Sequence, residues 1–181
     1  FELGMNRPGE ISPLSKLMHP DVAVITTIAA VHMANFSSTF DIADAKAEIF
    51  EGMSGGVGVL HRDNPYFPVL VAAACVAGVE RVISFGAHPE ATARLMDVES
   101  DDSGQKVCAR IDGHEIDYRL SVPGRHWVMN SLAVLCTAVS LGADLTQAAE
   151  ALAEVQAPAG RGRRSLIQLP TGELQLIDES Y

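Results

Sequence analysis

Lys46 is the residue whose neighbours in the sequence most favour chemistry. If residues 39–51 form a helix, Ile42, Ile49 and Phe50 fall on the same side of it as Lys46, so the amine lies on an apolar stripe. Partial burial lowers the pKa of a lysine and makes a neutral amine available. A lysine whose stem covers the core while its amine reaches water fits the same pattern. On the pattern alone, this second interpretation is the commoner one.

Two other polar side chains follow predicted strands. His32 comes a few residues after a buried strand, and Asp178 comes directly after another. Ligands of open α/β sheets collect at the carboxyl ends of strands, so both side chains could contact a ribose or a metal. A lone histidine in a loop is more often not a ligand, and Asp178 could simply face water. Glu2 is a single acid in an N-terminal loop and is uninformative by itself.

The remaining candidate residues are a cluster of arginines and two polar residues on one predicted helix. Arg161, Arg163 and Arg164 lie beside glycines, and such a loop could approach a phosphate closely or could simply be solvated. His126 and Asn130 are four residues apart, so they share one face at the start of a long apolar helix. There Asn130 needs a hydrogen-bond partner, either from the backbone or from a ligand.

The chain contains no P-loop, because that motif requires Gly-Lys-Ser or Gly-Lys-Thr. Its lysines, Lys16, Lys46 and Lys106, follow serine, alanine and glutamine. Without this phosphate cradle, we expect the chain alone to bind ATP weakly or not at all.

Length and composition predict one acidic globular domain. The 181 residues are 48% hydrophobic and 20% charged, which excludes disordered and fibrous classes. A net charge of −10 argues against binding to nucleic acid or to an anionic membrane surface. Cys75, Cys108 and Cys136 are widely spaced and predict reduced thiols in a cytoplasmic protein. Neither a secretory signal nor a membrane span is recognisable.

The predicted elements indicate an α/β fold with a mostly parallel sheet. Short apolar runs alternate with helical segments, which is typical of parallel strands joined by helices. After a short helix at 14–18, the strands are expected at 22–25, 57–60 and 82–85, and the helices at 39–51 and 66–77.

The middle of the chain predicts a small antiparallel region at about 98–121. Asp112-Gly113, between the strand-like runs 106–111 and 115–120, is a strong hairpin signal. We expect 99–104 to form an acidic turn. The remaining helices are predicted at 126–141 and 146–155, and the remaining strands at 165–169 and 174–177.

Several motifs, taken in order, resemble the Mur ligase family. The matching segments are residues 1–6 (Phe-Glu-Leu-Gly-Met-Asn), His32 with residues 44–50, residues 123–126 with Asn130, residues 160–162 and residues 177–181. They resemble the segment after the P-loop, the metal-histidine and carbamylated-lysine segment, the adenine-side helix, the arginine segment and the start of the Asp-x-Ser-Tyr-Asn-Ala-Asn-Pro motif. The first and last motifs are most similar to those of the MurF branch, which adds D-alanyl-D-alanine.

The resemblance implies that residues 1–181 are part of the central, ATP-binding domain of a Mur ligase, a P-loop NTPase-like fold lacking its P-loop strand. Both ends look cut, so a P-loop is expected upstream and a C-terminal domain downstream, and the chain alone is expected to be inactive. The implied protein is an ATP-dependent carbon–nitrogen ligase of peptidoglycan synthesis in the cytoplasm, and we expect it to be a monomer. It would join D-alanyl-D-alanine to UDP-N-acetylmuramoyl-tripeptide through an acyl phosphate. The alternatives are a non-catalytic nucleotide-binding or scaffold module, and a sister ligase of the Mur or folylpolyglutamate type.

The resemblance also implies a role for each candidate residue. Lys46 and His32 would be catalytic, and Glu2, His32 and Lys46 would bind Mg²⁺, with CO₂ held as a carbamate on Lys46. The ATP contacts would come from the adenine-side residues Asn130 and His126, from Arg161 at the γ-phosphate and from Asp178 at the ribose.

Overall fold

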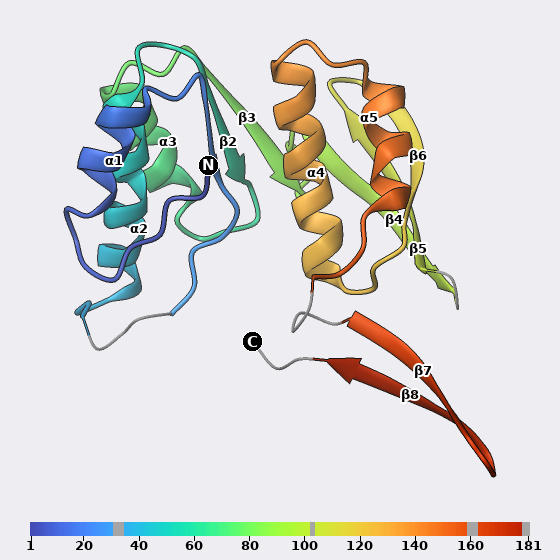
Figure 1. Cartoon of the computed structure of the whole chain (residues 1–181). Helices are drawn as coiled ribbons and strands as arrows, with labels where there is room; N and C mark the ends of the chain where they lie inside the picture. Colours follow the sequence, from blue (N-terminus) through green and yellow to red (C-terminus); the bar gives the residue numbers. More distant parts are fainter. Residues whose placement is uncertain (31–34, 102–103, 159–162, 179–181) are drawn as a thin grey trace.

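A six-stranded sheet forms the centre of the molecule. The computed structural model describes residues 1–30, 35–101, 104–158 and 163–178. The strands are β1 (Val22–Ile25), β2 (Val57–His61), β3 (Arg81–Gly86), β4 (Ala93–Asp101), β5 (Gly104–Ile111) and β6 (His114–Leu120). They lie side by side in chain order (Figure 1). β1 to β4 pair in parallel and β4 to β6 pair antiparallel, which confirms the predicted mostly parallel sheet with a small antiparallel region.

The predicted acidic turn at 99–104 is wrong in its first half. Glu99 and Asp101 belong to β4, which the sequence did not predict as a strand. Glu99 stands opposite Lys106, and the Asp101 carboxylate lies 2.8 Å from the guanidinium of Arg119. Opposite charges on neighbouring strands stabilise a sheet, so these acids are compatible with a strand whose partners lie elsewhere in the sequence.

Helices cover both faces of the sheet (Figure 1). α1 (Ile11–Met18), α2 (Thr39–Ala47) and α3 (Phe67–Val76) lie on one face, and α4 (Arg125–Ser140) and α5 (Leu145–Ala151) lie on the other. Strand side chains alternate between the two apolar clusters: Ala23 and Leu60 belong to the first, and Val24 and Val59 pack in the second. Burial on both faces explains why these strands are continuous apolar runs. No described helix is long and apolar enough to span a membrane.

The helix that carries Lys46 begins as predicted and ends differently. The Ser38 hydroxyl accepts a hydrogen bond from the Asp41 amide, and the Asp41 carboxylate accepts one from the Ser38 amide, which is a capping box. The predicted helix to residue 51 is wrong in its last turn, because residues Glu48–Gly52 form a 3₁₀ helix, η1. The Gly52 amide donates to the Ser15 hydroxyl at 3.1 Å, which ties the end of η1 to α1.

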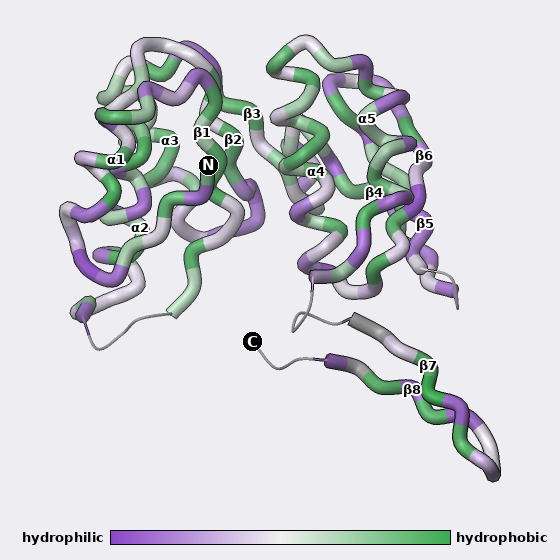
Figure 2. The backbone as a smooth tube through the Cα atoms, viewed as in Figure 1, coloured by the Kyte–Doolittle hydropathy of each residue, from purple (hydrophilic) through white to green (hydrophobic). Residues whose placement is uncertain are grey.

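The predicted hairpin at Asp112-Gly113 is present, and the two strands predicted near the C-terminus also pair with each other. Asp112 and Gly113 have positive φ angles of 50° and 87°, as the tight turn between β5 and β6 requires. β7 (Arg163–Leu169) and β8 (Gly172–Asp178) form a separate two-stranded sheet. Hydrophilic and hydrophobic residues alternate from Glu173 to Leu176 of β8 (Figure 2).

Alkaline pH is expected to destabilise the core because a buried thiol and a buried tyrosine hydroxyl resist deprotonation. Burial raises the pKa of the Cys136 thiol to about 12 and that of the Tyr118 hydroxyl to about 12. The unfolded chain loses the thiol proton above pH 9 and the hydroxyl proton above pH 10, while the folded protein keeps both, so stability falls as pH rises from 9 toward 12. The expected slope is about 1.4 kcal/mol per pH unit for each group inside its window.

Urea unfolding of the chain and of Cys136→Ala at several pH values between 8 and 11 measures this effect. The free energy of unfolding should fall less steeply with pH in the variant, because the contribution of the Cys136 thiol is absent. Equal slopes would contradict the role of Cys136.

Candidate active site

Lys46 and Glu2 line one cavity that runs along β1, from Asp21 before the strand to Thr26 after it. The cavity measures about 530 Å³, and Ile25 and Thr26, at the end of that strand, contribute to its wall. Lys46 projects from the last turn of α2, whereas Glu2 comes from the N-terminal segment. Two residues that the sequence separates by more than a whole βα unit therefore face the same space.

Burial controls the protonation of Lys46. The side chain is half-buried, and loss of hydration lowers its pKa, while the negative charge of Glu2 acts in the opposite direction. Burial is the larger effect, so the pKa lies below its usual value. A larger fraction of Lys46 is thus a neutral amine than at an exposed lysine. The prediction that Lys46 lies on the apolar side of its helix is confirmed, since Ile42 and Phe50 are fully buried.

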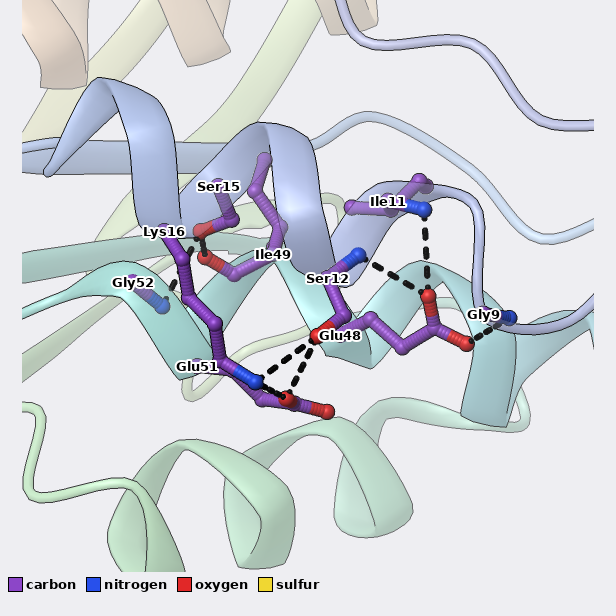
Figure 3. Close-up of polar contacts among 9 residues, drawn as sticks. All are labelled: Gly9, Ile11, Ser12, Ser15, Lys16, Glu48, Ile49, Glu51 and Gly52. Atoms are coloured by element: carbon purple, nitrogen blue, oxygen red, sulfur yellow. Dashed lines mark hydrogen bonds and ion pairs between the residues drawn. The ribbon is translucent and has the colours of Figure 1, made fainter.

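The helix α1, which contributes Ile11 and Met18 to the cavity, is fixed by η1 (Figure 3). The Glu48 carboxylate accepts hydrogen bonds from the amides of Gly9, Ile11 and Ser12 at 2.6–3.1 Å. These amides lie at the start of α1, where backbone N–H groups have no partner within the helix. A carboxylate there also interacts favourably with the helix dipole.

Glu48→Ala is expected to lower the free energy of unfolding by about 1–3 kcal/mol, because partly buried N–H groups lose a charged acceptor. Glu51→Ala is the matched control. Its carboxylate pairs with Lys16 at 2.6 Å, and both side chains are about half exposed, so its removal should cost less than about 1 kcal/mol. Urea titrations of both variants measure the difference. Equal costs would contradict the assigned role of Glu48.

The candidate nucleotide contacts lie elsewhere in the molecule. His126 and Asn130 are on α4, across the sheet from α2. The His126 ring is exposed and lies 5.5 Å from the Trp127 ring, centroid to centroid. Asn130 is half-buried, and none of the described residues donates to or accepts from its amide, which leaves the amide available to a ligand. Asp178 is on β8, opposite Arg163.

His32 and Arg161 lie outside the described residues. Among the candidates that are described, Glu2 and Lys46 line the same cavity. Within the described ranges, no group of three or more His, Cys, Asp or Glu side chains forms a ready metal site. Mg²⁺ commonly takes one or two carboxylates and fills its other positions with water and substrate phosphates. The Glu2 carboxylate fits that requirement, and Lys46 would fit it if its amine carried a carbamate.

His61 is a candidate functional residue that the sequence analysis did not single out. It ends β2, and its ring stacks on Phe85 with centroids 5.0 Å apart and planes at 3°. Its Nε2 lies 3.6 Å from an Asp63 carboxylate oxygen, too far for a hydrogen bond, and neither buried ring nitrogen has a described partner. Burial lowers the pKa of His61 more strongly than Asp63 raises it, which favours the neutral imidazole. The signal available in the sequence was a histidine directly after an apolar strand.

Comparison with known proteins shows similarity over the whole chain. Residues 1–138 match the family model described as the Mur ligase middle domain. The chain is 33% identical over 185 residues to the UDP-N-acetylmuramoyl-tripeptide–D-alanyl-D-alanine ligase of Escherichia coli, an alignment that covers 100% of the chain and 39% of that protein. It is 30% identical over 161 residues to the UDP-N-acetylmuramate–L-alanine ligase of Streptomyces coelicolor, covering 88% of the chain and 34% of that protein.

A solved structure shows the same similarity. A crystal structure of MurF from Acinetobacter baumannii superposes with a TM-score of 0.88 at 27% identity, covering 100% of this chain and 38% of that one. The chain therefore spans about two fifths of the length of these relatives.

Proposed function

The chain belongs to the Mur ligase family, to whose middle domain residues 1–138 correspond, and we propose that it is the ATP-binding part of a D-alanyl-D-alanine-adding ligase. The names of the similar proteins from Escherichia coli and Acinetobacter baumannii support this assignment. The observation that carries it is the cavity shared by Lys46 and Glu2. An amine with a lowered pKa and a carboxylate face the same space beside β1.

The proposed reaction forms an amide at the expense of ATP. The terminal carboxylate of UDP-N-acetylmuramoyl-tripeptide attacks the γ-phosphate, giving an acyl phosphate and ADP. The amine of D-alanyl-D-alanine then attacks the acyl carbon, and inorganic phosphate leaves. Catalysis of phosphoryl transfer depends mainly on positioning and on neutralising negative charge. We place this reaction in the cytoplasm and in a monomeric enzyme.

Lys46 supplies the most specific chemistry. Its neutral amine would bond to the carbon of CO₂ and lose a proton, which converts a cationic side chain into an anionic carbamate. The carbamate oxygens and the Glu2 carboxylate would then hold Mg²⁺, because hard cations prefer anionic oxygen ligands. When bound, Mg²⁺ supplies charge neutralisation for the phosphates. The walls of the cavity lower the pKa of Lys46 and so keep the reactive amine populated.

The remaining residues are proposed to bind the substrates. The His32 imidazole would be a second metal ligand, and the Arg161 guanidinium would contact the γ-phosphate. Asn130 and His126 would contact the adenine, and Asp178 would accept a hydrogen bond from the ribose. The free amide of Asn130 on α4 supports its part of this assignment.

An assay of the full-length protein tests the proposal. ATP, Mg²⁺, UDP-N-acetylmuramoyl-tripeptide and D-alanyl-D-alanine should yield a pentapeptide product and one phosphate per product, measured by mass spectrometry and phosphate release. UDP-N-acetylmuramate with L-alanine is the control pair, because the Streptomyces coelicolor ligase is named for that reaction. Product only from the control pair would identify a sister ligase. Nucleotide binding without turnover of either pair would favour a non-catalytic module.

A further inference from the structure

An apolar helix with one uncovered side borders a groove on the face opposite α4. All ten residues of α3 are apolar, yet only Leu70 and Ala74 are fully buried. Val76, at its end, is 90% exposed. A helix that is apolar all round is normally covered on every side. None of the described residues covers this side of α3.

The groove beside α3 has apolar walls and an acidic rim. It measures about 560 Å³, and Phe50, Ala73 and Val76 contribute to it. The acidic residues Asp44, Glu48 and Glu51 also line it. Lys16 is the one cation among the residues that line it, so three carboxylates, including that of Glu48, face one ammonium.

The charges at this rim are only partly used inside the described structure. Glu51 pairs with Lys16 at 2.6 Å, and Glu48 holds the start of α1. Asp44 is exposed, and none of the described residues forms an ion pair or hydrogen bond with it. A cationic group approaching the groove would therefore meet a free carboxylate next to an apolar surface.

We propose that this groove binds a basic amphipathic helix of another protein. The elements that line it, α1, α2, η1 and α3, are helical, so they offer no strand edge to which an extended peptide could add. A partner must bring its own hydrogen-bonded backbone, which a helix does. Its apolar side chains would cover Val76 and Ala73, and a lysine or arginine would pair with Asp44. A chain of net charge −10 favours approach by a basic partner.

The probe is a fluorescent amphipathic helix built from leucine and lysine, with its leucine–glutamate counterpart as the control peptide. Fluorescence anisotropy with the full-length protein should show binding of the lysine peptide only, and no binding of either peptide would show that another part of the protein covers α3. Val76→Asp should weaken binding about tenfold or more, because a charge would be placed in the apolar contact. Asp44→Asn should weaken it about two- to fivefold, as expected for an exposed ion pair. Circular dichroism checks that both variants are folded.

Matched variants separate the groove from general attraction between opposite charges. Leu141→Asp changes an exposed apolar residue at the end of α4, and Glu150→Gln removes an exposed acid on α5; both should bind the peptide as the unchanged chain does. Equal weakening by Asp44→Asn and Glu150→Gln, or equal binding of the two peptides, would overturn the proposal. Sedimentation that shows a dimer abolished by Val76→Asp would also overturn it, because a second copy would then cover α3.

Discussion

Replacing Lys46 with alanine is expected to reduce ligation by the full-length protein by about 100- to 1,000-fold, the range seen when one preorganised electrostatic group is removed. The change deletes the amine that would become the metal-binding carbamate, while α2 retains a good helix former. Steady-state phosphate release with saturating substrates measures the effect. Added formate or acetate should restore part of the activity, because a free carboxylate can occupy the space that the side chain vacates.

Two further variants define the chemistry of that loss. Lys46→Arg keeps the positive charge, but a guanidinium stays protonated and does not take up CO₂, so this variant should be as impaired as alanine. Lys16→Ala removes a lysine from an exposed ion pair and should leave ligation nearly unchanged. Normal activity in Lys46→Ala or in Lys46→Arg would remove the proposed role.

Gly52→Ala is expected to destabilise the protein by at least about 3 kcal/mol, at the upper end of overpacking effects. A Cβ atom at Gly52 would lie 2.0 Å from the Ser15 carbonyl oxygen and 2.6 Å from the Lys16 amide nitrogen. Both are backbone atoms of α1 and cannot turn away as a side chain can. The helix would have to leave η1, which breaks the hydrogen bond from the Gly52 amide to Ser15.

Thermal and urea unfolding of Gly52→Ala measure this cost, which corresponds to a fall in Tm of roughly 6–12 °C for a chain of this length. Gly4→Ala is the matched control, because nothing lies within 4 Å of its Cβ position and its φ angle is not in the left-handed region. Its effect should stay within about 0.5 kcal/mol. An unchanged midpoint in Gly52→Ala would show that α1 does not pack on η1 as described.

Local patterns predicted the parts of the fold that local interactions determine. The apolar run at Val22–Ile25 is β1, the Ser38–Asp41 capping box begins α2, and Asp112-Gly113 forms a tight turn. β4 was missed because its acids favour a loop in isolation. The charges that compensate them come from β5 and β6, and strand pairing of that kind is not visible in a local window.

The candidate site was predictable only in part for the same reason. Helical periodicity placed Lys46 on the apolar side of α2, and its lowered pKa follows from that burial. Its position beside Glu2 depends on how the N-terminal segment lies against β1, which no spacing rule gives. The burial of His61 likewise depends on its stacking against Phe85 of β3.

The most direct test of the proposed chemistry is to detect CO₂ on Lys46. The full-length protein, equilibrated with ¹³C-bicarbonate near pH 8, should show a carbamate carbonyl signal in its ¹³C NMR spectrum, and Lys16→Ala should keep it. The signal should disappear in Lys46→Arg. If the unchanged protein shows no carbamate signal, or if Lys46→Arg shows the same signal, Lys46 is not the residue that carries CO₂.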